Sequence, residues 1–507
     1  MSALRIPCVS EVASTSPRCI PQLAARRSLS RRAGRRATTQ VLNCAVNPRS
    51  TPSINVAAAL EAPTASRLAS PAGVAPAAGS GGFNSDILGL GQAIVDWSAS
   101  VDFSLLSTFN VPLGGRRVIT VEERASVMET LDEIGAPSQV SAGGSLANTL
   151  VGVARLARAA GKDLRVALGG SLGTDTLGQY FNSQLRSAGV RCLLDTHQHH
   201  AAQHALHPQP HDQHPQPTHP TQQPQQQPAH SAQQQQQHPS PEGHTGTVMV
   251  LTTPDAQRSF LSFFTSDRLA LSERLRSAVR GCRLVVMEGY LWEMEGAEAY
   301  MAEVIRIAHA AGAQVAMTAG DPGVVARHRE EMLRTIARGV DMVFTNEDEA
   351  ANLAGLPGPA ALASSPTASE EELEEAGERA ALALAELCPV AVVTAGSKGS
   401  YVCAMGEIHA VPPYWLPQGP VDTCGAGDAY MAGFTYAMMA GYDARTAGEF
   451  ASRVASAVIG RYGPHLSDED AEDLVGQLPE HTGPMRVALG GAAGQLELGG
   501  GAGGFSF

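Results

Sequence analysis

Short apolar segments alternate with amphipathic helical segments over the second half of the chain, and this alternation constrains the fold more than any other feature. The apolar segments are three or four residues long and rich in β-branched residues: 284–287, 314–317, 342–344 and 390–393. The helical segments lie between them, at 296–310, 330–337 and 371–386. Parallel strands need such helical crossovers, and continuously apolar strands are buried on both faces. The pattern predicts an α/β fold of three layers, with a mostly parallel central sheet and helices on both faces.

The ordered part of the chain is expected to begin near Asp86. Residues 87–96 predict a buried strand that runs into a glycine turn and ends on the polar residue Asp96. Farther along, residues 247–252 and 259–264 have strand composition and flank a Pro-Asp turn, which predicts a β-hairpin. We expect one folded domain over residues 83–478.

The N-terminal segment, residues 1–82, differs in composition from the folded part. Up to Ser50 it holds nine arginines and a single acid, Glu11, and it is rich in serine and alanine. This composition, without an apolar core, is typical of organellar transit peptides. We therefore expect an organellar protein, in the chloroplast rather than the mitochondrion. If the segment is only a disordered basic tail, the protein is cytoplasmic.

Three more segments are expected to lie outside the packed core. Residues 197–244 are dominated by Gln, His and Pro and hold eleven of the 16 histidines. We interpret them as a disordered surface insertion rather than a metal-binding tract, because their composition cannot bury a core. Residues 359–369 form a smaller insertion, and residues 479–507 form a glycine-rich flexible tail.

Charge, hydropathy and cysteine usage exclude several classes of protein. The formal net charge is -13, so nucleic acid is not expected as the main partner. No run of 18 apolar residues is present, so no membrane span is expected. The eight cysteines include no C-x-x-C pair, which fits neither a zinc site nor a disulfide framework. Free thiols in a reducing compartment are the expected state.

The segment with the clearest chemistry is Asp422-Thr423-Cys424-Gly425-Ala426-Gly427-Asp428, which precedes a predicted helix over 429–440. Small residues let the backbone approach a ligand, and the N-terminal end of a helix attracts an anion. A carboxylate beside such an anion site can take a proton from a hydroxyl that attacks phosphorus. The segment therefore predicts phosphoryl transfer to a hydroxyl group.

This segment resembles the D-T-x-G-A-G-D signature of the PfkB carbohydrate kinase family, the ribokinase-like kinases. The resemblance implies a ribokinase-like fold with a small β lid, ATP as the phosphate donor and Mg²⁺ as the metal. It implies that Asp428 is the catalytic base and that Asp422 lies near a monovalent-cation site, for example K⁺. It also assigns the anion hole for the transferred phosphate to Gly425, Ala426 and Gly427.

Two further segments resemble the acceptor side of the same family. The run from Ala142 to Thr149, AGGSLANT, is similar to the N-terminal family signature. The resemblance implies that Gly143 and Gly144 let the substrate lie on the backbone and that Asn148 hydrogen-bonds substrate hydroxyls. Asp96 is at the position where the family has a carboxylate that hydrogen-bonds two sugar hydroxyls. A carboxylate can accept both hydrogen bonds of a vicinal diol.

The nucleotide side is represented by two motifs. Residues 345–349, TNEDE, match the family's N-x-x-E motif, with Asn346 and Glu349 expected on one helix face. The resemblance assigns Asn346 to the ATP site and Glu349 to the hydrated Mg²⁺. An N-capped acidic helix start is the alternative interpretation.

The second nucleotide motif, residues 394–400, TAGSKGS, matches the family's T-x-G-x-x-G loop. The resemblance implies that Thr394, Gly396 and Gly399 line the ATP. Lys398 is either a phosphate contact or a solvated loop lysine, and the sequence leaves both open.

The acceptor is the least constrained part of the prediction. Glu288-Gly289-Tyr290-Leu291 resembles the adenosine-kinase-like branch, which favours a nucleoside or ribose-type acceptor over a hexose such as fructose. Residues 265–269 depart from the G-A-N loop that the family often shows. The partner is then a small sugar or nucleoside, and a homodimer is compatible with the sequence. A non-catalytic, fructokinase-like scaffold of a plastid complex is the alternative of another class, but it would not need Asp428 or Glu349.

Overall fold

The computed structural model describes residues 85–136, 138–196, 243–255, 257–265 and 268–479. The transit-like segment 1–82, almost all of the insertion 197–244 and the tail from residue 480 lie outside the described residues. The organellar location therefore stays a prediction. In the part that is described, no helix is both long and apolar enough to cross a membrane.

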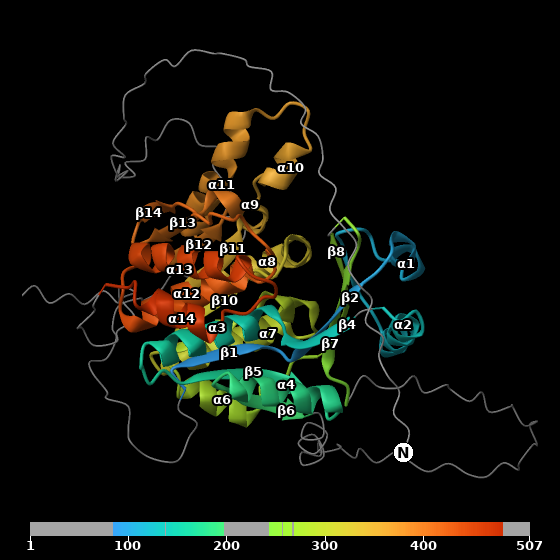
Figure 1. Ribbon diagram of the computed structural model, residues 1–507. Coiled ribbons are helices and arrows are strands. Elements are labelled where there is room, and N and C mark those ends of the chain that lie inside the picture. The colour runs from blue at the N-terminus through green and yellow to red at the C-terminus, as the bar shows by residue number, and fades with distance from the viewer. Residues whose placement is uncertain (1–84, 137, 197–242, 256, 266–267, 480–507) are drawn as a thin grey trace, which may run out of the picture. The chain divides into compact units, whose positions relative to one another are not determined.

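A nine-stranded sheet forms the centre of the fold (Figure 1), in the order β14-β13-β12-β11-β10-β9-β1-β5-β6. All neighbours from β6 to β12 are parallel, and only β13 and β14 are antiparallel additions at one edge. The predicted mostly parallel sheet is confirmed. Its strands are β1 (Ile87–Gln92), β5 (Val166–Leu172), β6 (Val190–Thr196), β9 (Leu284–Met287), β10 (Gln314–Thr318), β11 (Met342–Asn346), β12 (Val390–Thr394), β13 (Ser400–Ala404) and β14 (Glu407–Val411).

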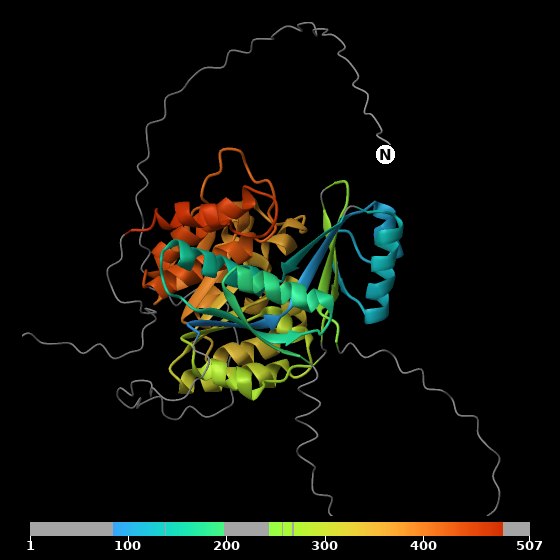
Figure 2. The same cartoon turned by 60° about the horizontal axis from the view of Figure 1, so that its bottom comes forward.

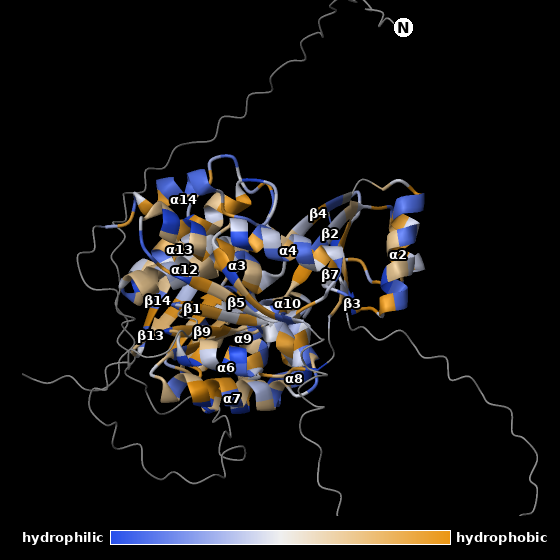
Figure 3. Cartoon of the chain, turned by 90° about the horizontal axis from the view of Figure 1, so that it is seen from below, coloured by the Kyte–Doolittle hydropathy of each residue, from blue (hydrophilic) through white to orange (hydrophobic). Residues whose placement is uncertain are grey.

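Helices cover both faces of this sheet. One face is covered by α3 (Ser145–Ala159), α4 (Thr176–Ser187), α12 (Ala426–Ala440), α13 (Ala444–Ile459) and α14 (Asp468–Val475). The other is covered by α6 (Glu273–Arg280), α7 (Ala297–Ala310), α8 (Pro322–Ala337), α9 (Glu347–Ala354) and α11 (Glu370–Ala385), with the short α10 (Pro359–Ala363) beside α9 and α11. In Figure 3 the central strands are predominantly hydrophobic, while hydrophilic stretches lie on helices such as α8 and α14.

The three layers follow from the alternation of side chains along each strand. In β9, Leu284 and Val286 join the core on the first face, whereas Val285 and Met287 join the core on the second. Successive side chains of a strand point to opposite faces, so a strand that is apolar throughout must be covered twice. The predicted three-layer fold is therefore confirmed, together with the reason for it.

A second, five-stranded sheet, which we call the lid together with α1 and α2, has the order β3-β8-β7-β2-β4. The predicted hairpin is confirmed as the antiparallel pair β7–β8. The other three strands and both helices come from residues 94–143, which the sequence patterns did not assign to the lid. Figure 2 shows α1 and α2 on the side of the lid sheet away from the central sheet. The lid elements are β2 (Ile94–Ser100), α1 (Phe103–Thr108), β3 (Arg116–Val118), α2 (Val121–Glu133), β4 (Ser138–Gly143), β7 (Gly246–Thr252) and β8 (Arg258–Phe263).

The predicted glycine turn within residues 87–96 is wrong. Gly89 and Gly91 lie inside β1, and the chain passes through Ala93 alone into the first lid strand. A Cβ at Gly89 would lie 2.7 Å from the Leu150 side chain, and one at Gly91 would lie 2.5 Å from Glu288 Oε2. These glycines therefore allow close approach of neighbouring groups and do not reverse the chain.

The parallel strands place their carboxyl ends along one edge of the central sheet, where ligands bind in open α/β sheets. Residues that follow β9, β10, β11 and β12 at this edge include Glu288, Asp321, Glu347 and Gly396. The lid is joined to the same edge because β2 continues directly from β1. The fold thus predicts the ligand site between the lid and the carboxyl ends of the strands.

The core on the α12 face provides a test of the fold. Phe434 of α12 is fully buried and packs edge-on against Phe344 of β11, with ring centroids 5.5 Å apart. We expect Phe434→Ala to lower the free energy of unfolding by about 3–5 kcal/mol, because the cavity it leaves cannot fully collapse. Tyr462→Ala, at a side chain that is 88% exposed, should change it by less than about 0.5 kcal/mol. Denaturant titration measures both, and equal losses would contradict the assigned core.

Candidate active site

A cavity of about 880 Å³ lies between the lid and the carboxyl ends of the central strands. Its floor includes Gln92, Ser145, Glu288 and Asp428, and its lid side includes Asp96. Further lining residues come from both sheets: Ile94, Gly114, Gly115, Arg116, Arg117, Val118, Gly144, Val248, Phe260, Ser262, Phe264, Tyr290, Glu293, Asp321, Gly323, Arg327 and Cys424. The cavity therefore brings the acceptor-side residues predicted from the sequence next to the predicted base.

Asp428 lies in the first turn of α12 and is held by the start of α3. Ser145 Oγ donates a hydrogen bond to Asp428 Oδ1 at 2.6 Å, and Asn148 Nδ2 donates one to Oδ2 at 2.9 Å. Thr149 Oγ1 donates to the main-chain oxygen of Asp428 at 3.2 Å. Burial raises the pKa of Asp428, while the bonds from Ser145 and Asn148 act in the opposite direction. The carboxylate is thus fixed in orientation and made more basic than an exposed aspartate.

Asn148 makes a contact that the sequence did not predict. The resemblance assigned its side chain to substrate hydroxyls, whereas the structure brings its amide nitrogen onto Asp428. Its Oδ1 atom is buried without a hydrogen-bond partner among the described protein atoms. Neither Ser145 nor this contact was predicted. Their signal in the sequence is the position of Ser145 and Asn148 one turn apart at the start of a helix.

The loop before Asp428 forms an open helix N-terminus. Gly425 has the left-handed backbone conformation (φ +77°), and a Cβ there would lie 2.6 Å from Pro464. A Cβ built on Gly427 meets no atom within 4 Å, so the space in front of it is open. The first N–H groups of a helix have no partner inside the helix. The predicted anion hole at Gly425, Ala426 and Gly427 is therefore compatible with the geometry of the loop.

Asp96 lies in β2, directly over the glycine pair of the acceptor motif. A Cβ at Gly143 would overlap Asp96 Oδ2, and Gly144 begins the turn into α3 with φ +87°. Burial and the negative charge of Asp428 raise the pKa of Asp96 to about 7, against a hydrogen bond from the Gly144 backbone that lowers it. The structure therefore places Asp96, Gly143, Gly144 and Asp428 in one acceptor-sized site.

The N-x-x-E motif has a different local structure from the expected one. Asn346 is the N-cap of α9 and stands before the helix, so it does not share a helix face with Glu349. Glu349 Oε2 accepts the Asn346 N–H at 2.9 Å, and Oε1 accepts the Asn346 amide at 2.8 Å. The side chain of Asn346 in turn accepts the Glu349 N–H, which completes a capping box. The alternative interpretation as a capped helix start therefore describes the contacts that the motif makes within the protein.

The same carboxylate nevertheless lies near other acidic side chains, although the described residues contain no group of three or more His, Cys, Asp or Glu side chains that could hold a metal ion. Burial and the charges of Asp321 and Asp348 raise the pKa of Glu349 to about 8, against the hydrogen bond from the Asn346 backbone that lowers it. Asp321, the N-cap of α8, was not predicted as a site residue, although it follows β10 at the ligand edge of the sheet. A concentration of carboxylates around a buried one fits a divalent cation that keeps its waters.

Asp422 has a protein cation as its partner. Its Oδ1 lies 2.8 Å from the guanidinium of Arg258, the first residue of lid strand β8, and also accepts the Cys424 N–H at 2.9 Å. Oδ2 accepts the Gly463 N–H at 3.2 Å. Burial alone would raise the pKa of Asp422. The two N–H bonds and the charge of Arg258 outweigh burial and hold the pKa of Asp422 below its usual range. The residue predicted near a monovalent cation thus ties the lid to the loop that precedes Asp428.

The second nucleotide motif follows β12. Thr394 ends that strand beside Asn346, its register partner on β11. A Cβ at Gly399, where φ is +103°, would overlap the carbonyl oxygen of Val411, so this turn requires glycine. Lys398 Nζ lies 2.5 Å from Glu347 Oε1 at the start of α9. The structure therefore joins the two nucleotide motifs, and it gives Lys398 an acidic partner.

Arg116 is a cavity residue that the sequence did not reveal. From β3 of the lid, its guanidinium lies 4.9 Å from the ring centroid of Tyr290 and 5.6 Å from that of Phe264. Its Nη1 atom is 3.2 Å from Asp321 Oδ2. The sequence around Arg116 has no motif that predicts a site residue. Arg116 reaches the cavity only because the lid lies over it.

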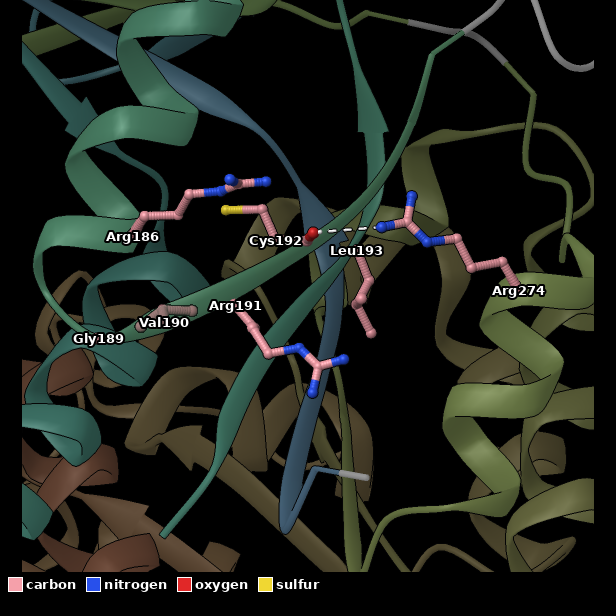
Figure 4. Close-up of a pocket in the computed structure, with 7 residues that line it drawn as sticks. All are labelled: Arg186, Gly189, Val190, Arg191, Cys192, Leu193 and Arg274. Carbon is pink, nitrogen blue, oxygen red and sulfur yellow. Dashed lines mark hydrogen bonds between the residues drawn. The ribbon is translucent and has the colours of Figure 1, made fainter. Parts of the chain in front are cut away.

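A second cavity, of about 380 Å³, lies at the β6 edge of the central sheet (Figure 4). Arg186 of α4, Arg191 of β6 and Arg274 of α6 surround it, and Arg274 donates to the main-chain oxygen of Cys192 at 3.4 Å. None of the motif residues lines it. Of the predicted acceptor-side residues, Asp96 and Gly144 line the larger cavity together with the predicted base Asp428.

Comparison with known proteins finds similar kinases. Residues 229–471 match the family described as "pfkB family carbohydrate kinase". Over 93 residues the chain is 38% identical to a nucleoside kinase of Methanothermobacter thermautotrophicus, a match that covers 18% of this chain and 29% of the relative. The chain thus spans less than a third of that curated relative.

Solved structures cover much more of the chain. Adenosine kinase from Sinorhizobium meliloti has 28% sequence identity and a TM-score of 0.57, with 77% of this chain and 98% of that chain covered. Adenosine kinase from Anopheles gambiae, in complex with P1,P4-di(adenosine-5) tetraphosphate, has 20% identity and a TM-score of 0.54, with 79% and 100% covered. The second likeness concerns the fold alone.

The ion pair between the lid and the anion loop can be tested by a double-mutant cycle. Asp422 is 9% exposed and Arg258 32% exposed in their side chains, so each loses a partly buried partner when the other is replaced. We expect Arg258→Met and Asp422→Asn to be non-additive, with a coupling of about 0.5–3 kcal/mol in the free energy of unfolding. Arg306→Met, which removes the exposed pair with Glu303, should cost at most about 1 kcal/mol. Strict additivity of the two site variants would show that the pair does not tie the lid to the loop.

Proposed function

We propose that the chain transfers the γ-phosphate of ATP to a hydroxyl of a sugar or nucleoside, with Asp428 as catalytic base, because residues 229–471 match the pfkB family of carbohydrate kinases. The observation that carries this proposal is the setting of Asp428. Its carboxylate is held by Ser145 and Asn148 at the floor of the acceptor cavity. It also stands in the first turn of α12, beside the open helix N-terminus.

In the proposed reaction the acceptor is first positioned by Asp96. Two hydroxyl groups of the acceptor donate to its carboxylate, and a third hydroxyl faces Asp428. Asp428 takes the proton of that hydroxyl while its oxygen forms a bond to the γ-phosphorus. The bond between the γ-phosphorus and the bridging oxygen breaks, and ADP leaves. The N–H groups of Gly425 to Gly427 and the helix N-terminus stabilise the charge on the transferred phosphoryl group.

The nucleotide is proposed to lie along the two motifs that follow β11 and β12. Asn346, Thr394, Gly396 and Gly399 are the residues that would line it. Glu349, with Asp321 nearby, would hold a hydrated Mg²⁺, and their clustered negative charge supports this assignment. When bound, the metal neutralises charge on the phosphate oxygens.

Closure of the lid would complete the site. Arg258 and Arg116 both reach from lid strands to carboxylates of the central domain, Asp422 and Asp321. A closed lid excludes water, which would otherwise accept the phosphoryl group in place of the substrate.

We favour a nucleoside or ribose-type acceptor over a hexose. The cavity volume is in the range of sites for drug-sized ligands, and the relatives named above include a nucleoside kinase and an adenosine kinase. Fructose is the second candidate. A plastid scaffold without kinase activity is the alternative function, and the following experiment tests it.

Turnover with a panel of acceptors tests the proposal. The protein is assayed with ATP, Mg²⁺ and ribose, fructose, adenosine, inosine, cytidine or pseudouridine. We expect transfer to at least one acceptor and a fall in kcat of about 10²–10⁴-fold in Asp428→Asn, because general-base catalysis is lost. Binding of an ATP analogue should persist in this variant. A folded wild-type protein that neither turns over any acceptor nor binds ATP would establish the scaffold alternative.

The raised pKa of Asp96 predicts the pH dependence of acceptor binding. With a pKa of about 7, Asp96 is largely protonated at pH 6 and ionised at pH 8. Only the ionised form accepts two hydroxyl hydrogen bonds, so the acceptor should bind more tightly as the pH rises through 7. In Asp428→Asn the repelling charge is removed, and the midpoint should move to lower pH. Calorimetric titration with acceptor at several pH values measures the affinity and its midpoint. Asp96→Asn is the control, in which the affinity should no longer depend on pH. A flat profile in the wild type would contradict the role of Asp96.

A further inference from the structure

Glu288 is a buried carboxylate in the cavity that the proposed reaction does not use. It directly follows β9, is 3% exposed and lines the cavity floor. A buried carboxylate is costly unless its oxygens are satisfied. The groups that donate hydrogen bonds to Glu288 therefore indicate its role.

Both oxygens of Glu288 accept backbone N–H groups from distant parts of the chain. Oε2 accepts the Gln92 N–H at 3.0 Å, at the end of β1. Oε1 accepts the Leu146 N–H at 3.3 Å, in the first turn of α3. A single side chain thus joins the end of β9, the end of β1 and the start of α3. Gly91 must be glycine for this arrangement, because a Cβ there would lie 2.5 Å from Oε2.

The bond to Leu146 replaces a missing helix cap. Gly144 is the N-cap residue of α3 and has no side chain to bond the free N–H groups of the first turn. Glu288 supplies that acceptor from another element, and its negative charge also suits the positive end of the helix. The position of the first turn of α3 therefore depends on Glu288.

The same first turn holds the proposed base. Ser145 and Asn148 donate to the two carboxylate oxygens of Asp428, and Thr149 donates to its main-chain oxygen. A shift of the helix start would move these donors together. Because a displacement of about 1 Å in a reacting group can cost about 100-fold in rate, the anchor of α3 controls the geometry of the reaction.

Glu288 and Asp428 also interact through their charges. Burial and the negative charge of Asp428 raise the pKa of Glu288 to about 7, against the two N–H bonds that lower it. Of two carboxylates near one another, one has its pKa raised, and the charge of Asp428 has this effect on Glu288.

We infer that Glu288 is a positioning residue for phosphoryl transfer: from the end of β9 its carboxylate anchors the first turn of α3, which in turn fixes Asp428. This inference rests on the proposed kinase activity. It concerns the orientation of the base and requires no contact between Glu288 and the reacting atoms.

Glu288→Gln is the main test, because it keeps the shape but replaces one acceptor oxygen by an NH₂ group. That group cannot accept a backbone N–H, so one of the two anchors is lost. We expect kcat to fall about 10- to 100-fold, with the KM for ATP unchanged. The acid limb of the kcat profile should move to higher pH, because weaker hydrogen bonds from Ser145 and Asn148 lower the pKa of Asp428 less. Glu298→Gln is the matched control: Glu298 of α7 pairs with Arg334 of α8 and with Arg338 at the end of α8, and its loss should leave kcat and the profile unchanged.

Hydrogen exchange gives a readout that does not depend on activity. Amides of residues 145–149 should exchange faster in Glu288→Gln than in the wild type and in Glu298→Gln. If Glu288→Gln does not fold, Glu288→Asp carries the test: its carboxylate is one methylene too short to span both N–H groups. This variant should lower kcat and move the acid limb in the same direction, because it also weakens the anchor of the Ser145 and Asn148 donors.

The outcomes separate this inference from the proposed function. A wild type without turnover on any acceptor would overturn the proposed function. An active wild type with unchanged kcat and unchanged exchange in the Glu288 variants would overturn only the inference. A loss of kcat that matches a loss of folded protein, with no change in the pH profile of Glu288→Gln, would also overturn it.

Discussion

The packing of α3 against α12 is the contact on which the candidate site depends. A Cβ at Gly152 of α3 would lie 2.7 Å from Ala432 of α12, so the two helices pack closely. Their N-terminal ends meet at the same point, which brings Asn148 to Asp428 although 280 residues separate them in the chain. The acceptor motif and the anion loop are thereby combined into one site. The hydrogen bonds that orient Asp428 exist only because these two helix starts are adjacent.

The second constraint is electrostatic. Asp96, Glu288 and Asp428 face one cavity, and the pKa of each is raised by burial and, for the first two, by the charge of Asp428. Near the nucleotide motifs, burial and the charge of Asp321 also raise the pKa of Glu349. Such clusters are unfavourable for stability but suit proton transfer and cation binding near neutral pH. The site thus concentrates negative charge where the proposed ligands supply hydroxyl protons and a metal ion.

The lid contributes in a different way. Its own core, formed by residues such as Phe109, Leu131, Leu251 and Phe263, keeps α1 and α2 on its outer side. Its inner side supplies Asp96 to the acceptor site, while Arg258 and Arg116 form ion pairs with Asp422 and Asp321. The lid is therefore connected to both the anion loop and the nucleotide side. Its position can couple acceptor binding to completion of the site.

The sequence by itself determined the class of fold and the chemical segments. Strands 284–287 and 390–393 are apolar at every position, and a strand of this kind can only be buried between two layers of helices. The glycine-rich loop before Asp428 and the motif at 345–349 are local features, so their helix starts follow from local backbone chemistry. The hairpin at 247–264 was also predictable, because strand alternation and a turn lie within one short segment.

Tertiary structure alone decided which side chains meet. The sequence predicts a turn at Gly89 and Gly91, yet both lie in β1, where they leave room for Leu150 and Glu288 from distant segments. Asn148 binds Asp428, Arg258 pairs with Asp422, and Glu288 caps α3, each across more than 100 residues. No local pattern records such partners, because residue type and spacing determine the conformation of a segment but not its neighbours. Those neighbours follow from strand order, from helix packing and from the closure of the lid over the carboxyl ends of the sheet.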